Sequence, residues 1–493
     1  MRLPWHQYAE DWPDAPALIH QLEVISWARL ASRVDTVASM LEQQGVVHGD
    51  VVCLLGHNSL EALLVYLANI QLGAISAWLM PEPAAVSLKK CQHIYQQGEP
   101  VKVFCSDSDW QILLRSGSKS GVSALNRIVI SEHFLSNDSG NSDFANGKRL
   151  DSQSMVQPKS QATAFEPQQL VSIVFTSGST GQPKAVAHQY TQHQASAEGL
   201  LAQFDYARDD SWLLSLPMFH VSGLAIVHRW LVRGARLKLG RGDLIADIGG
   251  VTHASLVPAQ LKRLLESGQD LRLKRVLLGG AHIPLELAKQ AQQLGIDTWL
   301  GYGMTEMAST VTAKPVDGQP GVGSLLASRE LILDEQQILV KGATLACGYY
   351  CQGVLHPLVD ETGWFHTNDL GRFVSGELNI DGRADNCFIS GGENIHCEEI
   401  ELATNRHSDV VQCVVVPVED AQFGARPLLL VETRSPLDVQ DIQNFLAQEL
   451  VKFKVPERIE SLPSALIGRG IKLSRYQVKR WVNSHFTELK VIF

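Results

Sequence analysis

The chain has 493 residues, of which 45% are hydrophobic and 19% charged, a composition that supports large folded cores and excludes a disordered chain. One hydrophobic core rarely organises so many residues, so we expect at least two domains. The 42 basic and 52 acidic residues give a net charge of −10, which argues against a nucleic-acid partner, because phosphate backbones are bound chiefly by Lys and Arg.

No apolar run approaches the roughly 18 residues that a membrane-spanning helix needs. The N-terminal residues also lack the apolar stretch of a secretory signal, so we expect a cytoplasmic protein without a transmembrane segment. The eight cysteines are scattered without a CxxC pair, and we expect them to be free thiols. Cys347 and Cys351 would supply half of a metal site, but no nearby residues complete it.

The first part of the chain predicts alternating helices and strands. Apolar residues recur at helical spacing over 30–41, and the apolar run 51–55 indicates a strand. A second helix near 61–72 leads into a strand at 74–79. This alternation predicts an α/β fold with a largely parallel sheet. From about 116 to 168 the residues are mostly Ser, Asn, Gly and Gln, which predicts surface loops around one apolar patch.

The second part of the chain repeats the alternation and then changes character. The expected elements are strands at 170–175, 185–187, 275–278 and 338–340 and a helix at about 190–204. Beyond residue 379 the pattern indicates a small α+β unit, with strands at 410–416 and 428–432 and helices near 438–453 and 474–486. We therefore expect a large N-terminal domain at 1–384 and a smaller C-terminal domain at 385–493.

The segment TSGSTGQPK at 176–184 is suited to binding phosphate. Glycines let backbone N–H groups approach phosphate oxygens, hydroxyls add donors, and Lys184 adds charge. A flexible hairpin is the simplest alternative, although few hairpins have this composition with a terminal Pro-Lys. In a P-loop NTPase the lysine opens a helix directly after the loop. Here Pro183 precedes the lysine and a strand is expected to follow, which disfavours a kinase or an ATPase.

This loop resembles the signature of the adenylate-forming superfamily, which includes acyl-CoA synthetases, peptide-synthetase adenylation domains and luciferases. Four further segments resemble the family's motifs in the same order and with similar spacing: PMFHVSG at 217–223, GYGMTE at 301–306, HTND at 366–369 and GRAD at 382–385. Five motifs in order make a specific signal. The resemblance implies a large N-terminal domain of α/β subdomains and a smaller, mobile α+β C-terminal domain.

The resemblance implies a reaction in which a carboxylate attacks the α-phosphate of ATP. Two anions must meet, so catalysis depends on positioning and charge neutralisation. The residues that the resemblance assigns to the nucleotide are Thr176, Ser177, Gly178, Ser179, Thr180, Gly181, Lys184, Gly279, Gly280, Ala281, Tyr302, Gly303, Asp369 and Arg383.

Within this set, Tyr302 would stack on adenine, Asp369 would accept hydrogen bonds from the ribose hydroxyls, and Arg383 would reach ribose or phosphate. Glu306 would bind Mg²⁺, a hard ion that suits oxygen ligands. A core tyrosine and a surface ion pair are the structural alternatives for Tyr302 and for Asp369 with Arg383. Asn368 stands where the family usually has glycine, which leaves the backbone there open.

The resemblance also implies three catalytic residues. Thr305 would face the α-phosphate, His220 lies in a segment that resembles an aromatic or histidine gate, and Lys472 follows a glycine-rich loop near the C-terminus, where the family places its catalytic lysine. An extra isoleucine before Lys472 departs from the commonest pattern. Arg469 and Lys454 are the alternatives.

The segment 389–401 resembles that of coenzyme A ligases more than that of peptide-synthetase domains. Ser390, Gly391 and Gly392 would leave room for the pantetheine arm, and Asp385 would be the hinge about which the C-terminal domain moves. No carrier domain follows the last helix, so we expect free coenzyme A as the acceptor.

For the acid, the resemblance is strongest to the o-succinylbenzoate:CoA ligases of menaquinone biosynthesis, on segments 219–236 and 305–314 and the ending GIKLSR. Their acid has two carboxylates, of which one is a spectator. A cation should hold the spectator, and Arg229 is the candidate, with Ser222 and Thr310 nearby. The alternative is that Arg229 lies on a solvated helix face.

The expected small molecules are therefore a carboxylic acid, ATP and coenzyme A, with Mg²⁺. Two other functions stay open at this point. One is another aryl or short-chain acyl-CoA synthetase, and the other is a non-catalytic nucleotide-binding sensor. The oligomeric state is open as well, a homo-oligomer included.

Overall fold

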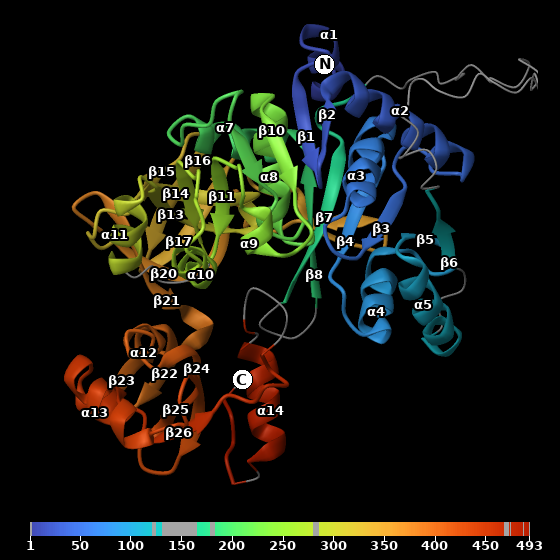
Figure 1. Ribbon diagram of the computed structural model, residues 1–493. Helices are drawn as coiled ribbons and strands as arrows, with labels where there is room; N and C mark the ends of the chain where they lie inside the picture. Colours follow the sequence, from blue (N-terminus) through green and yellow to red (C-terminus); the bar gives the residue numbers. More distant parts are fainter. Residues whose placement is uncertain are drawn as a thin grey trace, which may run out of the picture.

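The computed structural model describes residues 2–120, 125–130, 165–177, 183–279, 285–467, 473, 475–486 and 488–492. In Figure 1 the elements up to β21 (Glu377–Arg383) form a large body, and the elements after it form a smaller body beside the larger one. The predicted fold class is confirmed, with a large N-terminal α/β domain and a smaller C-terminal α+β domain. The boundary at residue 385 and the mobility of the smaller domain stay predictions.

One sheet of the large body is parallel at its centre and has an antiparallel edge. Its described strands are β3 (Val51–Leu55), β4 (Ile75–Leu79), β5 (Val101–Phe104), β6 (Leu125–Ile128), β7 (Leu170–Ser177), β8 (Pro183–Gln189), β18 (Gly348–Cys351) and β19 (Val354–His356), in the order β19-β18-β8-β7-β4-β3-β5-β6. The strands from β7 to β6 pair in parallel, and β8, β18 and β19 pair antiparallel. The helices after its strands are α3 (Leu60–Leu72), α4 (Ala84–Ile94) and α5 (Asp107–Ser120).

The other large sheet follows the same plan. Its described strands are β1 (Pro16–His20), β2 (Glu23–Ser26), β9 (Ser211–Leu213), β10 (Arg236–Leu239), β11 (His253–Leu256), β12 (Arg275–Leu278), β13 (Asp297–Met304), β14 (Ser309–Pro315) and β15 (Ser324–Leu325), in the order β15-β14-β13-β12-β11-β9-β10-β1-β2. The described helices around it are α1 (Pro4–Asp11), α2 (Trp27–Gln43), α7 (Tyr190–Leu201), α8 (Val221–Arg233), α9 (Leu244–Asp247), α10 (Pro258–Glu266) and α11 (Leu285–Gln293). The alternation that predicts a largely parallel sheet thus belongs to two sheets, each parallel at its centre with antiparallel strands at one or both edges.

A small antiparallel sheet completes the large body and leads toward the C-terminal domain. It contains β16 (Arg329–Asp334), β17 (Gln337–Gly342), β20 (Phe365–Val374) and β21, in the order β16-β17-β20-β21. The last strand ends at Arg383, directly before the short 3-10 turn Ala384–Asn386.

One apolar core joins the two large sheets. It includes side chains of α3, α7 and α8 together with strand residues of both sheets. Helix α3 lies deep in this core, because Leu60 and every residue from Ala62 to Ile70 are buried. The Ser59 hydroxyl accepts a hydrogen bond from the backbone N–H of Ala62 at its N-terminus, and Gly73 ends it with φ of 73°. Helices α3, α7 and α8 therefore pack between the two sheets and fix their relative positions.

The C-terminal body is a three-stranded sheet covered on both faces. Its described elements are β22 (Cys387–Ser390), β23 (Glu393–His396), α12 (Cys397–Thr404), β24 (Val410–Asp420), β25 (Gly424–Thr433), α13 (Val439–Glu449), β26 (Arg458–Ser461) and α14 (Arg475–His485). Alternate residues of β24 and β25 point to opposite faces, so one apolar cluster lies under α12 and α13 and another under α14.

One expectation needs correction in the segment predicted as loops at 116–168. Helix α5 continues to Ser120, and residues 125–128 form β6, which pairs in parallel with β5. Ile128 is buried in the main core, so burial outweighs the polar composition around it. Residues 131–164 lie outside the described part of the chain.

All eight cysteines are free thiols, as predicted. The sulfurs of Cys53 and Cys91 lie 3.7 Å apart in the core. Within the part of the chain that the structure describes, no helix combines the length and the apolar character needed to cross a bilayer.

Candidate active site

The predicted phosphate loop connects β7 and β8. These strands pair antiparallel, with Thr176 opposite Lys184. Lys184 therefore lies on a strand, as the sequence predicts, and not at the start of a helix. Its exposed ammonium lies 5.2 Å from the ring centre of Tyr349 on the neighbouring β18. The predicted loop residues Gly178, Ser179, Thr180 and Gly181 and the side chain of Ser177 lie outside the described part.

The turn between β13 and β14 carries Thr305 and Glu306. A side chain on Gly303 would collide with the backbone carbonyl of Ser309, so glycine is needed where the two strands approach. Burial raises the pKa of the Glu306 carboxyl, although the hydroxyl of Tyr349 donates a hydrogen bond to its Oε1 at 3.3 Å. Tyr349 thus contacts both Lys184 and Glu306.

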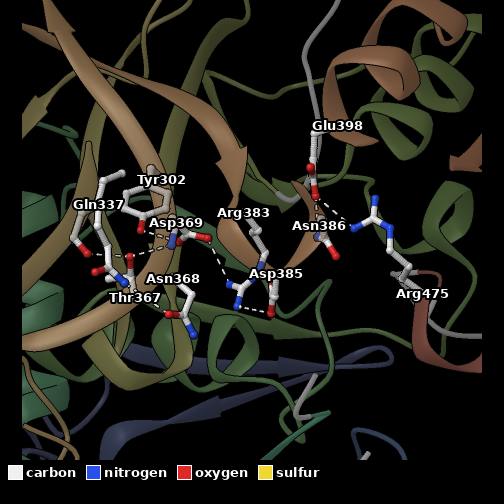
Figure 2. A network of polar contacts seen from close by, with 11 residues as sticks. Tyr302, Gln337, Thr367, Asn368, Asp369, Arg383, Asp385, Asn386, Glu398 and Arg475 are labelled. Carbon is white, nitrogen blue, oxygen red and sulfur yellow. Dashed lines mark hydrogen bonds and ion pairs between the residues drawn. The ribbon is translucent and has the colours of Figure 1, made fainter. Parts of the chain in front are cut away.

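Tyr302, Asp369 and Arg383 come together from three strands, as Figure 2 shows. The β20–β21 pairing places Asp369 opposite Arg383, whose Nη1 donates to Asp369 Oδ1 at 3.0 Å. The Tyr302 hydroxyl donates to Asp369 Oδ2 at 2.6 Å. Burial and the Asp369 charge raise the pKa of Tyr302, so its hydroxyl stays protonated. The adenine and ribose roles of these residues stay predictions.

Asn368 has φ of 60°, the left-handed conformation that glycine adopts most easily. Asparagine is among the residues that tolerate it best. Its Oδ1 accepts a hydrogen bond from Gln337 Nε2 at 3.2 Å (Figure 2). Asparagine in place of glycine is therefore compatible with the backbone of β20 directly before Asp369. Gly279 directly follows β12, while Gly280 and Ala281 lie outside the described part.

Arg229 is buried in the middle of the large body, with 2% of its surface exposed. Its Nη2 donates to Thr310 Oγ1 at 3.3 Å, and its guanidinium carbon lies 5.3 Å from the ring centre of Trp212. Burial lowers the pKa of Arg229 to about 9. Among the described residues no carboxylate forms an ion pair with it, and its Nε has no hydrogen-bond partner. The alternative of a solvated helix face is wrong.

The other residues expected near the acid lie at the start of α8. His220 directly precedes the helix, where burial lowers the pKa of its imidazole. Ser222 lies in the first turn, seven residues before Arg229 and therefore on the same side of the helix. The structure thus brings Arg229 and Thr310 into contact and places Ser222 two turns away along one face.

The turn between β22 and β23 contains the predicted coenzyme A segment. Gly391 and Gly392 have φ of 60° and 91° and form a two-residue hairpin loop, which requires positive φ at both positions. The hairpin alone explains both glycines, so room for pantetheine stays a prediction. Ser390 is buried, and its hydroxyl has no partner among the described residues.

Lys472 and Arg469 lie outside the described part, so the catalytic lysine stays a prediction. Lys454, the described alternative, is already paired. Its ammonium donates to both carboxylate oxygens of Glu399, at 2.6 and 2.7 Å.

Sequence reasoning missed three residues that shape the site. Tyr349 contacts both Lys184 and Glu306, and Arg329 donates to the Thr310 carbonyl at 2.9 Å. His188 donates to the Thr305 carbonyl at 2.8 Å. Tyr349 and Arg329 lie in no recognisable motif, but the two-residue period of β8 would have placed His188 on the same face as Lys184.

Asp385 lies in the 3-10 turn after β21 and accepts a hydrogen bond from Arg383 Nε at 2.9 Å. If this residue is the hinge, Asp385→Pro should restrict it, because proline fixes φ near −65°. We expect the two half-reactions, adenylate formation and thioester formation, to lose rate unequally when each is measured by single-turnover kinetics. Asp385→Ala is the control, since it removes the contact with Arg383 and leaves φ free. Parallel losses in the proline variant would show that the hinge lies elsewhere.

The comparisons with known proteins agree with this fold. The chain belongs to the AMP-binding enzyme family, whose model matches residues 5–350, and the model of the AMP-binding enzyme C-terminal domain matches residues 399–466. More particularly, the chain is 40% identical over 480 residues to the 2-succinylbenzoate–CoA ligase of Salmonella typhimurium, which covers 97% of each chain. It is 38% identical to that of Escherichia coli, over 97% of this chain and 98% of the relative.

A solved structure of an E. coli MenE variant with bound OSB-AMS has a TM-score of 0.80 and 36% sequence identity. The match covers 97% of this chain and 98% of that one. These findings confirm the resemblance to the adenylate-forming superfamily.

Proposed function

We propose that this protein is a 2-succinylbenzoate:CoA ligase of menaquinone biosynthesis. In the proposed reaction a carboxylate of 2-succinylbenzoate attacks the α-phosphate of ATP, and pyrophosphate leaves. The sulfur of coenzyme A then attacks the acyl-adenylate, and AMP leaves. Relatives named for this activity match nearly the whole chain, which supports the proposal.

Buried Arg229 is the observation that carries the choice of acid. Burying a charge without a partner is costly, so a guanidinium held there is best explained by an anion that joins it on binding. The rigid fork of arginine suits a carboxylate. An aromatic dicarboxylate still has one carboxylate free when the other is activated, whereas benzoate or a simple fatty acid has none.

The nucleotide end of the proposed site has suitable chemistry. Glu306 fits Mg²⁺, because its carboxylate is a hard oxygen ligand whose charge is disfavoured by burial until a cation joins it. Bound Mg²⁺ would neutralise charge on the phosphates. Lys184 would add a second positive charge, and Thr305 would face the α-phosphate. Tyr302 and Asp369 would hold adenine and ribose.

The two alternatives differ in what they require of these residues. Another aryl or short-chain acyl-CoA synthetase needs no cation at the position of Arg229. A non-catalytic nucleotide-binding sensor needs no catalytic lysine, whereas this chain has Lys472 at the matching place. A cytoplasmic location stays a prediction from the sequence, and the oligomeric state stays open.

The test is ATP–pyrophosphate exchange with a panel of acids: 2-succinylbenzoate, benzoate, succinate and a medium-chain fatty acid. We expect exchange to depend on added acid, with the highest kcat/KM for 2-succinylbenzoate, and a thioester to form when coenzyme A is added. Preference for a monocarboxylic acid would favour the other synthetases. ATP binding without exchange for any acid would favour the sensor.

A further inference from the structure

Hydrogen bonds from other elements hold the turn that carries Thr305 and Glu306. Three of its backbone carbonyls each accept one: Thr305 O from His188 Nε2 at 2.8 Å, Glu306 O from the Ala346 N–H at 2.8 Å and Ala308 O from Ser196 Oγ at 2.6 Å. A fourth carbonyl, that of Thr310 at the start of β14, accepts from Arg329 Nε at 2.9 Å. The donors come from β8, α7 and the region 329–346. The path of this turn is therefore set by its surroundings.

The turn needs such support because its backbone is strained. Ala308 has φ of 50° and Ser309 has φ of 107°, in the region that side-chain-bearing residues rarely occupy. Conformations of this kind persist only where surrounding contacts over-determine them, and they cluster at functional sites. Loss of a supporting hydrogen bond should let the turn relax toward a commoner backbone shape.

His188 donates to the carbonyl of Thr305, the residue predicted to face the α-phosphate. A carbonyl only accepts, so Nε2 of His188 carries the proton, and burial lowers the pKa of the ring to about 4, which keeps it neutral at physiological pH. Its ring lies 4.9 Å from that of His193, which stacks on His228 at 4.4 Å. Ser172, which lies opposite His188 in the β7–β8 pairing, contacts His193 Nε2 through its hydroxyl at 2.7 Å. The stack fixes the ring, and β8 carries both His188 and Lys184.

We propose that His188 is a positioning residue for adenylate formation, which fixes the turn so that Thr305 and Glu306 face the ATP phosphates and Mg²⁺. The proposal rests on the proposed function for its chemistry. His188 itself contacts the backbone of the turn and not the reacting atoms. Misplacement of a catalytic group by about 1 Å is enough to slow a reaction by roughly 100-fold.

The test compares His188→Gln with His188→Asn. The glutamine amide nitrogen can occupy the place of Nε2 and keep the donor, whereas the shorter asparagine places it where Nδ1 lies and loses the contact. We expect His188→Asn to lower kcat for adenylate formation by roughly 10- to 100-fold and to weaken Mg²⁺-dependent ATP binding in calorimetry. His188→Gln should recover most of both. Thioester formation from preformed adenylate should keep its KM for coenzyme A.

Ser172→Ala is the matched control, because it removes a hydrogen bond to His193 in the same histidine cluster and leaves the contact between His188 and the Thr305 carbonyl in place. It should lower thermal stability without changing the Mg²⁺ dependence of ATP binding. Equal Mg²⁺ dependence in wild type and His188→Asn, or an equal loss in Ser172→Ala, would overturn the positioning role. The comparison uses whichever acid supports exchange in the wild type, so failure with 2-succinylbenzoate would count against the proposed function and not against His188.

Discussion

Arg229→Ala is expected to lower kcat/KM for 2-succinylbenzoate by roughly 30-fold or more while leaving the KM for ATP almost unchanged. Removing one partner of a buried charge pair typically costs about 2 to 5 kcal/mol, because the remaining charge stays buried and unpaired. In the variant that remaining charge would be the spectator carboxylate. Within the part of the chain that the structure describes, the Arg229 side chain contacts Thr310 and Trp212, neither of which is predicted to bind nucleotide, so ATP binding should be spared.

Two further variants sharpen this test. Arg229→Lys keeps the charge without the two-pronged geometry, so it should recover only part of the loss. Arg233→Ala removes an arginine one turn later on α8, whose Nη2 donates to the Leu201 carbonyl at 3.2 Å, and should leave the choice of acid unchanged. If Arg229→Ala activates 2-succinylbenzoate with the same kcat/KM as the wild type does, Arg229 does not bind the spectator carboxylate.

Lys472→Ala is expected to slow adenylate formation by roughly 100-fold or more, the usual scale for losing a group that stabilises charge only in the transition state. Folding and ATP affinity should change little, and thioester formation from a preformed adenylate should suffer much less. Rapid-quench measurement of each half-reaction separates these effects. Equal slowing of both half-reactions would contradict the assignment.

Lys454→Ala is the matched control for this prediction. Its ammonium is held by Glu399, so the substitution should lower the stability of the C-terminal domain more than the rate of adenylate formation. A larger loss of adenylate formation in Lys454→Ala than in Lys472→Ala would transfer the catalytic role to Lys454.

Most helices and strands could be predicted from the sequence because their patterns are local. The helical spacing at 30–41 and the apolar run 51–55 both lie in elements of the expected type, α2 and β3. The division into two sheets could not be predicted, because strand order depends on pairings such as β1 with β10, which are far apart in the chain. Strand β6 was missed because its few apolar residues lie between polar segments.

In the site, too, local patterns could be predicted and contacts between distant segments could not. The family resemblance predicted Tyr302, Asp369 and Arg383. The register of β20 and β21 places Asp369 opposite Arg383, and the Tyr302 hydroxyl donates to Asp369. The burial of Arg229 could not be predicted, since the sequence pattern also allowed a solvated helix face. Its burial results from packing of nearly every residue of α8 between Gly223 and Leu231. His188 contacts a backbone carbonyl. Every residue type carries one, so the sequence could not indicate this contact.

The guanidinium of Arg229, which has no carboxylate partner among the described residues, also creates a conflict between stability and activity. In the ligand-free protein this buried charge opposes folding, and an apolar residue of similar volume would pack beside Trp212 and Thr310 without that cost. A selection for heat resistance alone would therefore tend to discard the arginine, whereas a selection for growth that depends on the product would retain it. If Arg229 binds the spectator carboxylate as proposed, the same residue lowers the stability of the protein without ligand and determines its choice of acid.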